Sequence, residues 1–182
     1  NSEADHLDHY GTQENYRAAF VDHVQHAVKS VGMCGDDEGN LAVLRALDAS
    51  AAAHTVVYAT QDEASLGDLN GAAFVHIESE SESAQSGAEH FTLHVPAGLL
   101  DGQERMVPVT RTGPGIHNAR NASAAIIAAA LLGVDIEKAA EVTTSFLGAA
   151  RRFQVRGTVS QVTVVDDYAH HPTEISALLD AA

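Results

Sequence analysis

The sequence predicts an α/β fold: a mainly parallel sheet flanked by helices with a small antiparallel β insertion, followed by the first strands of a second, Rossmann-like α/β domain. One observation behind this prediction is that short β-branched runs alternate with helical patterns early in the chain, as in βαβ units. Another is that Ala-rich helices give way to a β-rich segment at residues 151–153. We therefore expect one domain over residues 1–150 and the start of another over residues 151–182.

The first elements follow from hydrophobic spacing. Residues 11–28 have the pattern of an amphipathic helix, with Thr12 as the expected N-cap. Residues 30–40 hold a short apolar run that Gly and Asp stop, as at the carboxyl end of a strand. Residues 41–52 predict a second helix, and residues 54–60 have the β-branched and aromatic character of another strand.

The middle of the chain changes character. Residues 72–98 and 104–110 predict two or three antiparallel strands around the polar stretch 78–87, ESESESAQSG, which we expect to be a solvated loop. Helical patterns return over residues 111–135, after a Gly-Pro-Gly turn, and over residues 135–148. A connector then leads into a strand pair.

Composition limits the function classes. The chain has 182 residues and a net charge of −15, so its field repels nucleic acids and anionic membranes, although local donors or metal ions can still hold one small nucleotide. The single cysteine, Cys34, excludes an intramolecular disulfide framework and fits a reducing cytoplasm, where we expect the protein. The longest apolar stretch, 122–134, is shorter than the ~20 residues that span a bilayer. With no initiator Met and a helix pattern just beginning at its end, the chain is expected to be a piece of a longer protein.

Polar side chains cluster in the opening stretch NSEADHLDH. Asp5, His6, Asp8 and His9 stand where a strand would give way to the first helix. Carboxylate oxygens with an imidazole suit Mg²⁺ or Mn²⁺ better than a closed zinc site. The alternative is an ordinary polar surface loop.

A second cluster, GPGIHNARN, places His117, Asn118 and Asn121 at the start of a helix, where free N–H groups favour polar or anionic ligands. An Asn side chain both donates and accepts hydrogen bonds, which suits the edge of a purine. Helix capping by Asn118 is an equally good explanation.

The last two clusters lie near the end of the chain. Arg151 and Arg152, in the connector, could clamp a phosphate or pair with nearby carboxylates. The stretch VTVVDDYAHHP is a strand that ends in two acids, and open α/β folds bind ligands at the carboxyl ends of their strands. The alternative is a simple turn, with Asp167 as a cap and Pro172 starting a helix.

Together, NSEADHLDHYG, GIHNARNASAA, FLGAARRFQVRG and VVDDYAHHPTEI resemble, in their order and spacing, the Mur ligases, the ATP-dependent amide ligases of peptidoglycan precursor synthesis. The DDYAHHPTE and RRF forms are most similar to the branch that joins L-alanine to UDP-N-acetylmuramate. Several later-acting members carry a carbamylated lysine in the context YRAAK, where this chain has Phe20, which agrees with the alanine-adding branch.

The resemblance implies roles for individual residues. It implies that His6 is a ligand of the second Mg²⁺ ion, that Arg152 reaches the ATP phosphates, and that Asp167 holds the ribose. His117, Asn118 and Asn121 match the element whose asparagines meet adenine. By this resemblance, residues 1–150 are the later part of the central ATP-binding domain.

The chain also departs from the family pattern, because it contains no G-x-x-x-x-G-K-[ST] phosphate loop. The resemblance implies ATP and two Mg²⁺ ions for the complete enzyme, so we expect the 182 residues alone to be inactive. Two other hypotheses stay open: a recycling ligase that attaches a whole peptide to the same sugar nucleotide, and a non-catalytic nucleotide-binding module.

Overall fold

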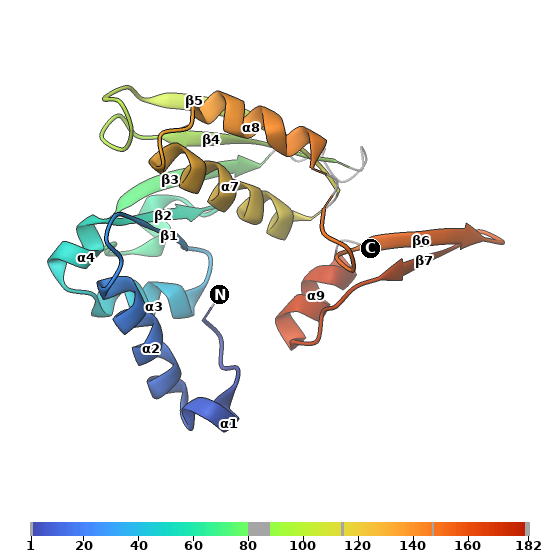
Figure 1. Cartoon of the computed structure of the whole chain (residues 1–182), viewed down its shortest axis with the longest axis horizontal. Coiled ribbons are helices and arrows are strands. Elements are labelled where there is room, and N and C mark those ends of the chain that lie inside the picture. The colour runs from blue at the N-terminus through green and yellow to red at the C-terminus, as the bar shows by residue number, and fades with distance from the viewer. Residues whose placement is uncertain (1, 80–87, 114, 147, 181–182) are drawn as a thin grey trace.

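The computed structural model describes residues 2–79, 88–113, 115–146 and 148–180. Within these parts the chain forms a five-stranded sheet in the order β1-β2-β3-β4-β5 and a separate two-stranded sheet of β6 and β7 (Figure 1). The strands are β1 Val31–Cys34, β2 Thr55–Ala59, β3 Ala73–Ser79, β4 Ala88–Val95, β5 Arg105–Thr112, β6 Gln154–Val159 and β7 Val162–Asp166. The helices are α1 Leu7–Tyr10, α2 Gln13–Gln25, α3 Glu38–Ala46, α4 Ala49–Ala53, α5 Glu63–Leu66, α7 Ile116–Leu131, α8 Ile136–Ser145 and α9 Pro172–Asp180.

The larger sheet is mixed, which confirms the α/β class. β1, β2 and β3 pair in parallel, while β4 pairs antiparallel with both β3 and β5. The predicted antiparallel strands are therefore a continuation of the parallel sheet, with β3 as the strand shared by both halves. Of the polar loop predicted at 78–87, residues 80–87 lie outside the described parts of the chain.

Helices cover both faces of the sheet, and β2 shows why. All five residues of β2 are buried. Val56 and Tyr58 pack into a core with residues of α7 and α8, whereas Val57 and Ala59 pack into a second core with residues of α2 and α3. A strand buried on both faces needs a near-continuous apolar run, which VVYA within HTVVYAT provides.

Polar side chains set several element boundaries. The Thr12 hydroxyl accepts a hydrogen bond from the Asn15 N–H at 3.2 Å, so Thr12 is the N-cap of α2, as predicted. The helix predicted over residues 41–52 is instead two helices, because the Asp48 side chain accepts from the Ala51 N–H and starts α4. In the described ranges, no helix is long and apolar enough to cross a membrane.

Residues 151–180 form a small unit of their own, the β6–β7 hairpin and α9, which stands beside the larger sheet in Figure 1. Ser160 and Gln161 join the two strands with φ angles of 50° and 67°, as a two-residue hairpin turn of the primed type requires. The domain boundary between residues 150 and 151 stays a prediction.

Candidate functional site

The start of helix α7 is hydrogen-bonded to a buried carboxylate. Its N-cap is Gly115, whose φ of 104° favours glycine, and the Gly115 N–H donates to Glu89 Oε1 at 2.5 Å. Glu89 lies on β4 and is only 6% exposed. Asn118 is the third residue of the helix and Gly115 is at the N-cap position, so the prediction that Asn118 is the cap of α7 is wrong. Pro114, from the Gly-Pro-Gly turn, lies outside the described residues.

His117 follows Gly115 by two residues and is half-buried against charged neighbours. Burial, together with Arg111 and Arg120, holds the pKa of His117 below its ordinary value, and this effect outweighs the opposing influence of Asp167 and Glu89. The imidazole is therefore mainly neutral at pH 7. Asp167, from the end of the chain, is one of the charged groups that act on His117, and its influence alone would raise the pKa of His117.

A partly buried ion pair, which was not predicted from the sequence, joins the same helix to the residues after β1. Arg120 Nε donates to Asp36 Oδ2 at 2.6 Å, and the Asp36 side chain is only 3% exposed. The same carboxylate accepts from the Thr60 N–H and hydroxyl and from the Gln61 N–H. Asp36 and Thr60 follow β1 and β2 almost directly, and this strand-end position is the signal that could have identified them.

Asp167 uses both of its oxygens to hold the connector. Oδ2 accepts from the Phe153 N–H at 2.6 Å, and Oδ1 accepts from the Ala169 N–H at 2.7 Å. The second bond closes a local turn, which agrees with the alternative interpretation of this stretch as a simple turn. The helix α9 begins at Pro172, as that interpretation also predicted. Across the same junction, the Tyr168 N–H donates to the Arg151 carbonyl at 2.9 Å. Asp167 therefore has a structural role here whether or not it also binds a ligand.

The two connector arginines lie against residues of the same small unit. Arg151 stacks over the Tyr168 ring at 4.9 Å. Arg152 Nη1 lies 3.8 Å from Glu174 Oε1, and the two side chains are 56% and 37% exposed, so this ion pair is weak. Glu174 also accepts from the backbone N–H groups of His170 and His171, and these bonds are the main cause that lowers its pKa.

The N-terminal loop carries His6, whose φ of 52° is left-handed. The His6 side chain is 70% exposed, and its Nε2 lies 3.6 Å from Asp5 Oδ2. Within the described residues, no three His, Cys, Asp or Glu side chains are grouped so that they could hold a metal ion. The structure therefore does not bring Asp5, His6, Asp8 and His9 together as one group of ligands, and the role of His6 stays a prediction.

Glu3, in the same loop, reaches the small unit at the end of the chain. The Thr173 hydroxyl donates to Glu3 Oε1 at 2.8 Å, and His171 Nδ1 lies 3.5 Å from Glu3 Oε2. No hydrogen bond or ion pair among the described residues joins His6 to Arg152 or Asp167. The loop that carries His6 is thus connected to the segment that carries Asp167 through Glu3.

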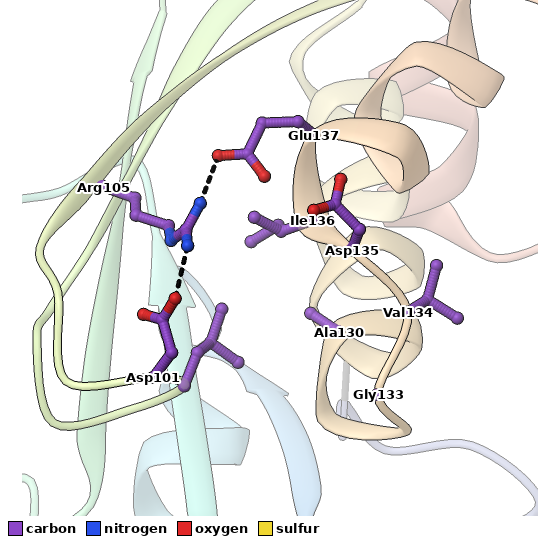
Figure 2. A pocket seen from close by; sticks show the side chains of 9 residues that line it. Asp101, Arg105, Ala130, Gly133, Val134, Asp135, Ile136 and Glu137 are labelled. Carbon is purple, nitrogen blue, oxygen red and sulfur yellow. Dashed lines mark hydrogen bonds and ion pairs between the residues drawn. The ribbon is translucent and has the colours of Figure 1, made fainter.

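One pocket lies away from the predicted site residues. It encloses about 300 Å³ between the loop before β5 and the turn between α7 and α8 (Figure 2). The Arg105 guanidinium donates to the carboxylates of Asp101 and Glu137 across it. None of the residues predicted to bind nucleotide or metal lines this pocket.

The chain is similar in sequence to known proteins of one family. Residues 151–182 match the family described as Mur ligase, glutamate ligase domain. The whole chain is 78% identical, over 182 residues, to a UDP-N-acetylmuramate--L-alanine ligase of Bifidobacterium adolescentis, and 61% identical to one of Bifidobacterium longum. The resemblance to the Mur ligases is confirmed.

Solved structures agree with the fold. A UDP-N-acetylmuramate-alanine ligase from Thermotoga maritima matches 98% of this chain and 36% of its own, with a TM-score of 0.57 at 25% identity. A pseudomurein peptide ligase type C from Methanothermus fervidus has the same fold, with a TM-score of 0.69 at 21% identity over 100% of this chain and 40% of its own. The chain spans 35% and 36% of the lengths of the two Bifidobacterium relatives, although both alignments cover all of it.

The Mur ligase resemblance therefore includes all four stretches that first indicated it. The structure puts Asn118 and Asn121 on α7, Arg152 in the connector and Asp167 directly after β7. The roles that the resemblance implies for these residues stay predictions.

Proposed function

We propose that this chain is part of an ATP-dependent ligase that joins L-alanine to UDP-N-acetylmuramate, a cytoplasmic step of peptidoglycan precursor synthesis. The observation that carries the proposal is the 78% identity over all 182 residues to a ligase of that name. The electrostatic influence of Asp167 on His117 supports it, since these residues come from the two ends of the proposed nucleotide site.

The proposed adenosine site lies between α7 and the end of β7. Asn118 and Asn121 meet the adenine edge, because an amide matches both the amino donor and the ring-nitrogen acceptor of a purine. The neutral His117 adds no charge beside the base. Asp167 holds the ribose: each carboxylate oxygen already accepts one backbone N–H and has a further lone pair for a ribose hydroxyl.

Arg152 and His6 serve the phosphates in this proposal. The exposed Arg152 makes only a weak pair with Glu174 and is available to a phosphate, which it can bind with two parallel hydrogen bonds. Mg²⁺ binds through few protein ligands, together with phosphate oxygens and water, so the exposed His6 is a suitable single ligand. When bound, Mg²⁺ neutralises the negative charge that builds up as phosphate and carboxylate approach.

The reaction makes an amide from a carboxylate, so the acyl group must first be activated. ATP phosphorylates the lactyl carboxylate of UDP-N-acetylmuramate, and the amine of L-alanine then displaces phosphate from the acyl phosphate. The residues of this chain bind and orient the nucleotide, which makes the transfer effectively unimolecular. Because adenine contacts the larger unit and ribose the smaller one, ATP favours closure of the two about the connector.

The test uses the full-length protein and measures phosphate release from ATP in the presence of UDP-N-acetylmuramate. We expect release with L-alanine, little with glycine or L-serine, and none from the 182-residue chain alone. A preference for a peptide over L-alanine would instead establish the recycling ligase. Nucleotide binding without turnover, under every condition, would establish a non-catalytic module.

His6→Ala and Asp167→Ala in the full-length protein test the individual assignments. We expect each variant to turn over much more slowly than the wild type. His6→Ala should raise the Mg²⁺ concentration needed for half-maximal rate, and Asp167→Ala should raise KM for ATP. Unchanged rates would remove these two assignments without affecting the proposed reaction.

A further inference from the structure

The N-terminal half of α7 is held at two points by buried carboxylates. Glu89, from β4, accepts from the Gly115 N–H at the helix start, and Asp36, behind β1, accepts from Arg120 about a turn later. Asn118 and Asn121 lie between or beside these two points. The helix segment that carries the proposed adenine contacts is therefore bonded to the carboxyl end of β1 through Asp36 and to the beginning of β4 through Glu89.

The bond between Arg120 and Asp36 is well suited to fix a position. Asp36 is almost completely buried, yet its pKa lies below the ordinary value: burial alone would raise the pKa, but the Thr60 N–H and Arg120 more than offset this. The carboxylate is thus ionised and held by several donors from the loop after β2. Arg120 Nη2 also lies 3.4 Å from Thr60 Oγ1, so the guanidinium contacts two strand ends at once.

We propose that Arg120, through its bond to Asp36, is a positioning residue that fixes Asn118 and Asn121 for adenine. The inference rests on the proposed function, because it takes the adenine assignment from there. Arg120 is adjacent to Asn121 and two residues after Asn118, within a single helical turn of 3.6 residues. Rotation of this turn about the helix axis would break the buried bond, and that restraint sets the direction of both amides.

Arginine suits this role better than lysine. Its planar guanidinium presents several donors in a fixed arrangement, so one side chain can bond Asp36 and contact Thr60 together. A lysine keeps the charge opposite Asp36 but offers one flexible ammonium group. Arg120→Lys should therefore retain the ion pair and lose part of the orientation.

The chain provides a matched control in Arg105. This arginine also joins two elements through carboxylates, Asp101 in the loop before β5 and Glu137 on α8, but it lies at the separate pocket shown in Figure 2. Arg105→Leu should lower the thermal unfolding midpoint, because it removes two ion pairs, but it should leave nucleotide binding unchanged.

The experiment compares Arg120→Leu, Arg120→Lys, Arg105→Leu and Asn118→Ala in the full-length protein. For each we measure the thermal unfolding midpoint, the dissociation constant of a non-hydrolysable ATP analogue with Mg²⁺, and KM for ATP and for UDP-N-acetylmuramate. For Arg120→Leu we expect KM for ATP and the analogue dissociation constant to rise roughly tenfold, the effect of losing about one hydrogen bond between the misdirected amides and adenine. KM for UDP-N-acetylmuramate should not change, and Arg120→Lys should lie between Arg120→Leu and the wild type.

The outcomes separate this inference from the proposed function. If Asn118→Ala weakens binding of the ATP analogue and Arg120→Leu does not, the positioning role is wrong and the adenine assignment is retained. The role of Arg120 is also wrong if Arg105→Leu and Arg120→Leu weaken binding of the ATP analogue equally, because a general loss of stability then explains both effects. If the wild type binds no ATP analogue, the adenine assignment and the role of Arg120 are both wrong. If Arg120→Leu does not fold, the split between the two KM values in Arg120→Lys decides.

Discussion

Replacing Gly39 by alanine should release the N-terminal loop that carries His6. Gly39 lies in the first turn of α3, where an added Cβ would come 2.4 Å from Ser2 Oγ and 2.9 Å from the Ser2 carbonyl oxygen. Ser2 is fully buried there, and its N–H donates to Asp37 Oδ1 at 3.1 Å. The alanine methyl group and Ser2 cannot occupy the same space, so the loop must move.

Two opposing effects determine the magnitude. A glycine in a helix is usually about 0.5–1 kcal/mol less favourable than alanine, so the substitution would stabilise α3 in the absence of the loop. Against this, a hydrogen bond to a charged acceptor such as Asp37 contributes about 1.5–3 kcal/mol, and burial of the loop adds to it. We expect a net destabilisation of about 1–2 kcal/mol when the two effects are combined.

The assay is urea unfolding of the full-length protein, together with the Mg²⁺ dependence of phosphate release. Gly39→Ala should lower the unfolding midpoint and raise the Mg²⁺ concentration needed for half-maximal rate, because His6 is four residues from Ser2. Gly98→Ala is the control, since nothing lies within 4 Å of the added methyl group there. A Gly39→Ala protein that is more stable than the wild type, with unchanged Mg²⁺ dependence, would refute the close contact between Ser2 and α3.

Three further predictions concern single contacts. Glu3→Ala and Thr173→Val should each raise KM for ATP in the full-length protein, and the double variant should do no more than the stronger single one, because both remove the same 2.8 Å bond; full additivity would show that the contact does not couple the two segments. His117 should titrate below pH 6.5 by NMR. Because a lowered pKa disfavours the protonated form in the folded protein, stability is retained above the unfolded-state pKa of about 6.5 and is lost as the pH falls through the folded one, and His117→Gln should reduce that loss. Thr12→Ala should cost about 1 kcal/mol of unfolding free energy through the lost cap of α2, while a cost near zero would mean that water replaces the hydroxyl.

Local patterns predicted elements well where a single property decides them. The VVYA run within HTVVYAT is apolar because β2 is covered on both faces, and Thr12 and Pro172 mark helix starts by their own chemistry. The break between α3 and α4 was missed because Asp48 stands inside an otherwise continuous helical pattern and starts a new helix by accepting one N–H.

Candidate site residues were harder to predict because their positions depend on distant partners. Asp36 and Arg120 are 84 residues apart, and only the packing of α7 across the strand ends brings them together. The role of Glu89 is likewise hidden in the sequence, where it looks like an exposed acid beside a polar loop, although it is buried beneath the start of α7. Asn118 was ambiguous for the opposite reason, since an Asn near a helix start satisfies a capping pattern equally well, and only the backbone of Gly115 excludes it.

These partners also explain how a chain with a net charge of −15 can offer a place for a nucleotide. Three acids that contact α7 or belong to the proposed site are already engaged: Asp36 by Arg120, Glu89 by the Gly115 N–H, and Asp167 by two backbone N–H groups. An ionised carboxylate that accepts such bonds presents less of its charge to a neighbouring ligand. Arg152, by contrast, is held only weakly. We therefore expect the distribution of hydrogen bonds, more than the sum of charges, to govern phosphate binding in this part of the molecule, and the salt dependence of ATP binding in Arg152→Gln compared with Asp36→Asn would measure that difference directly.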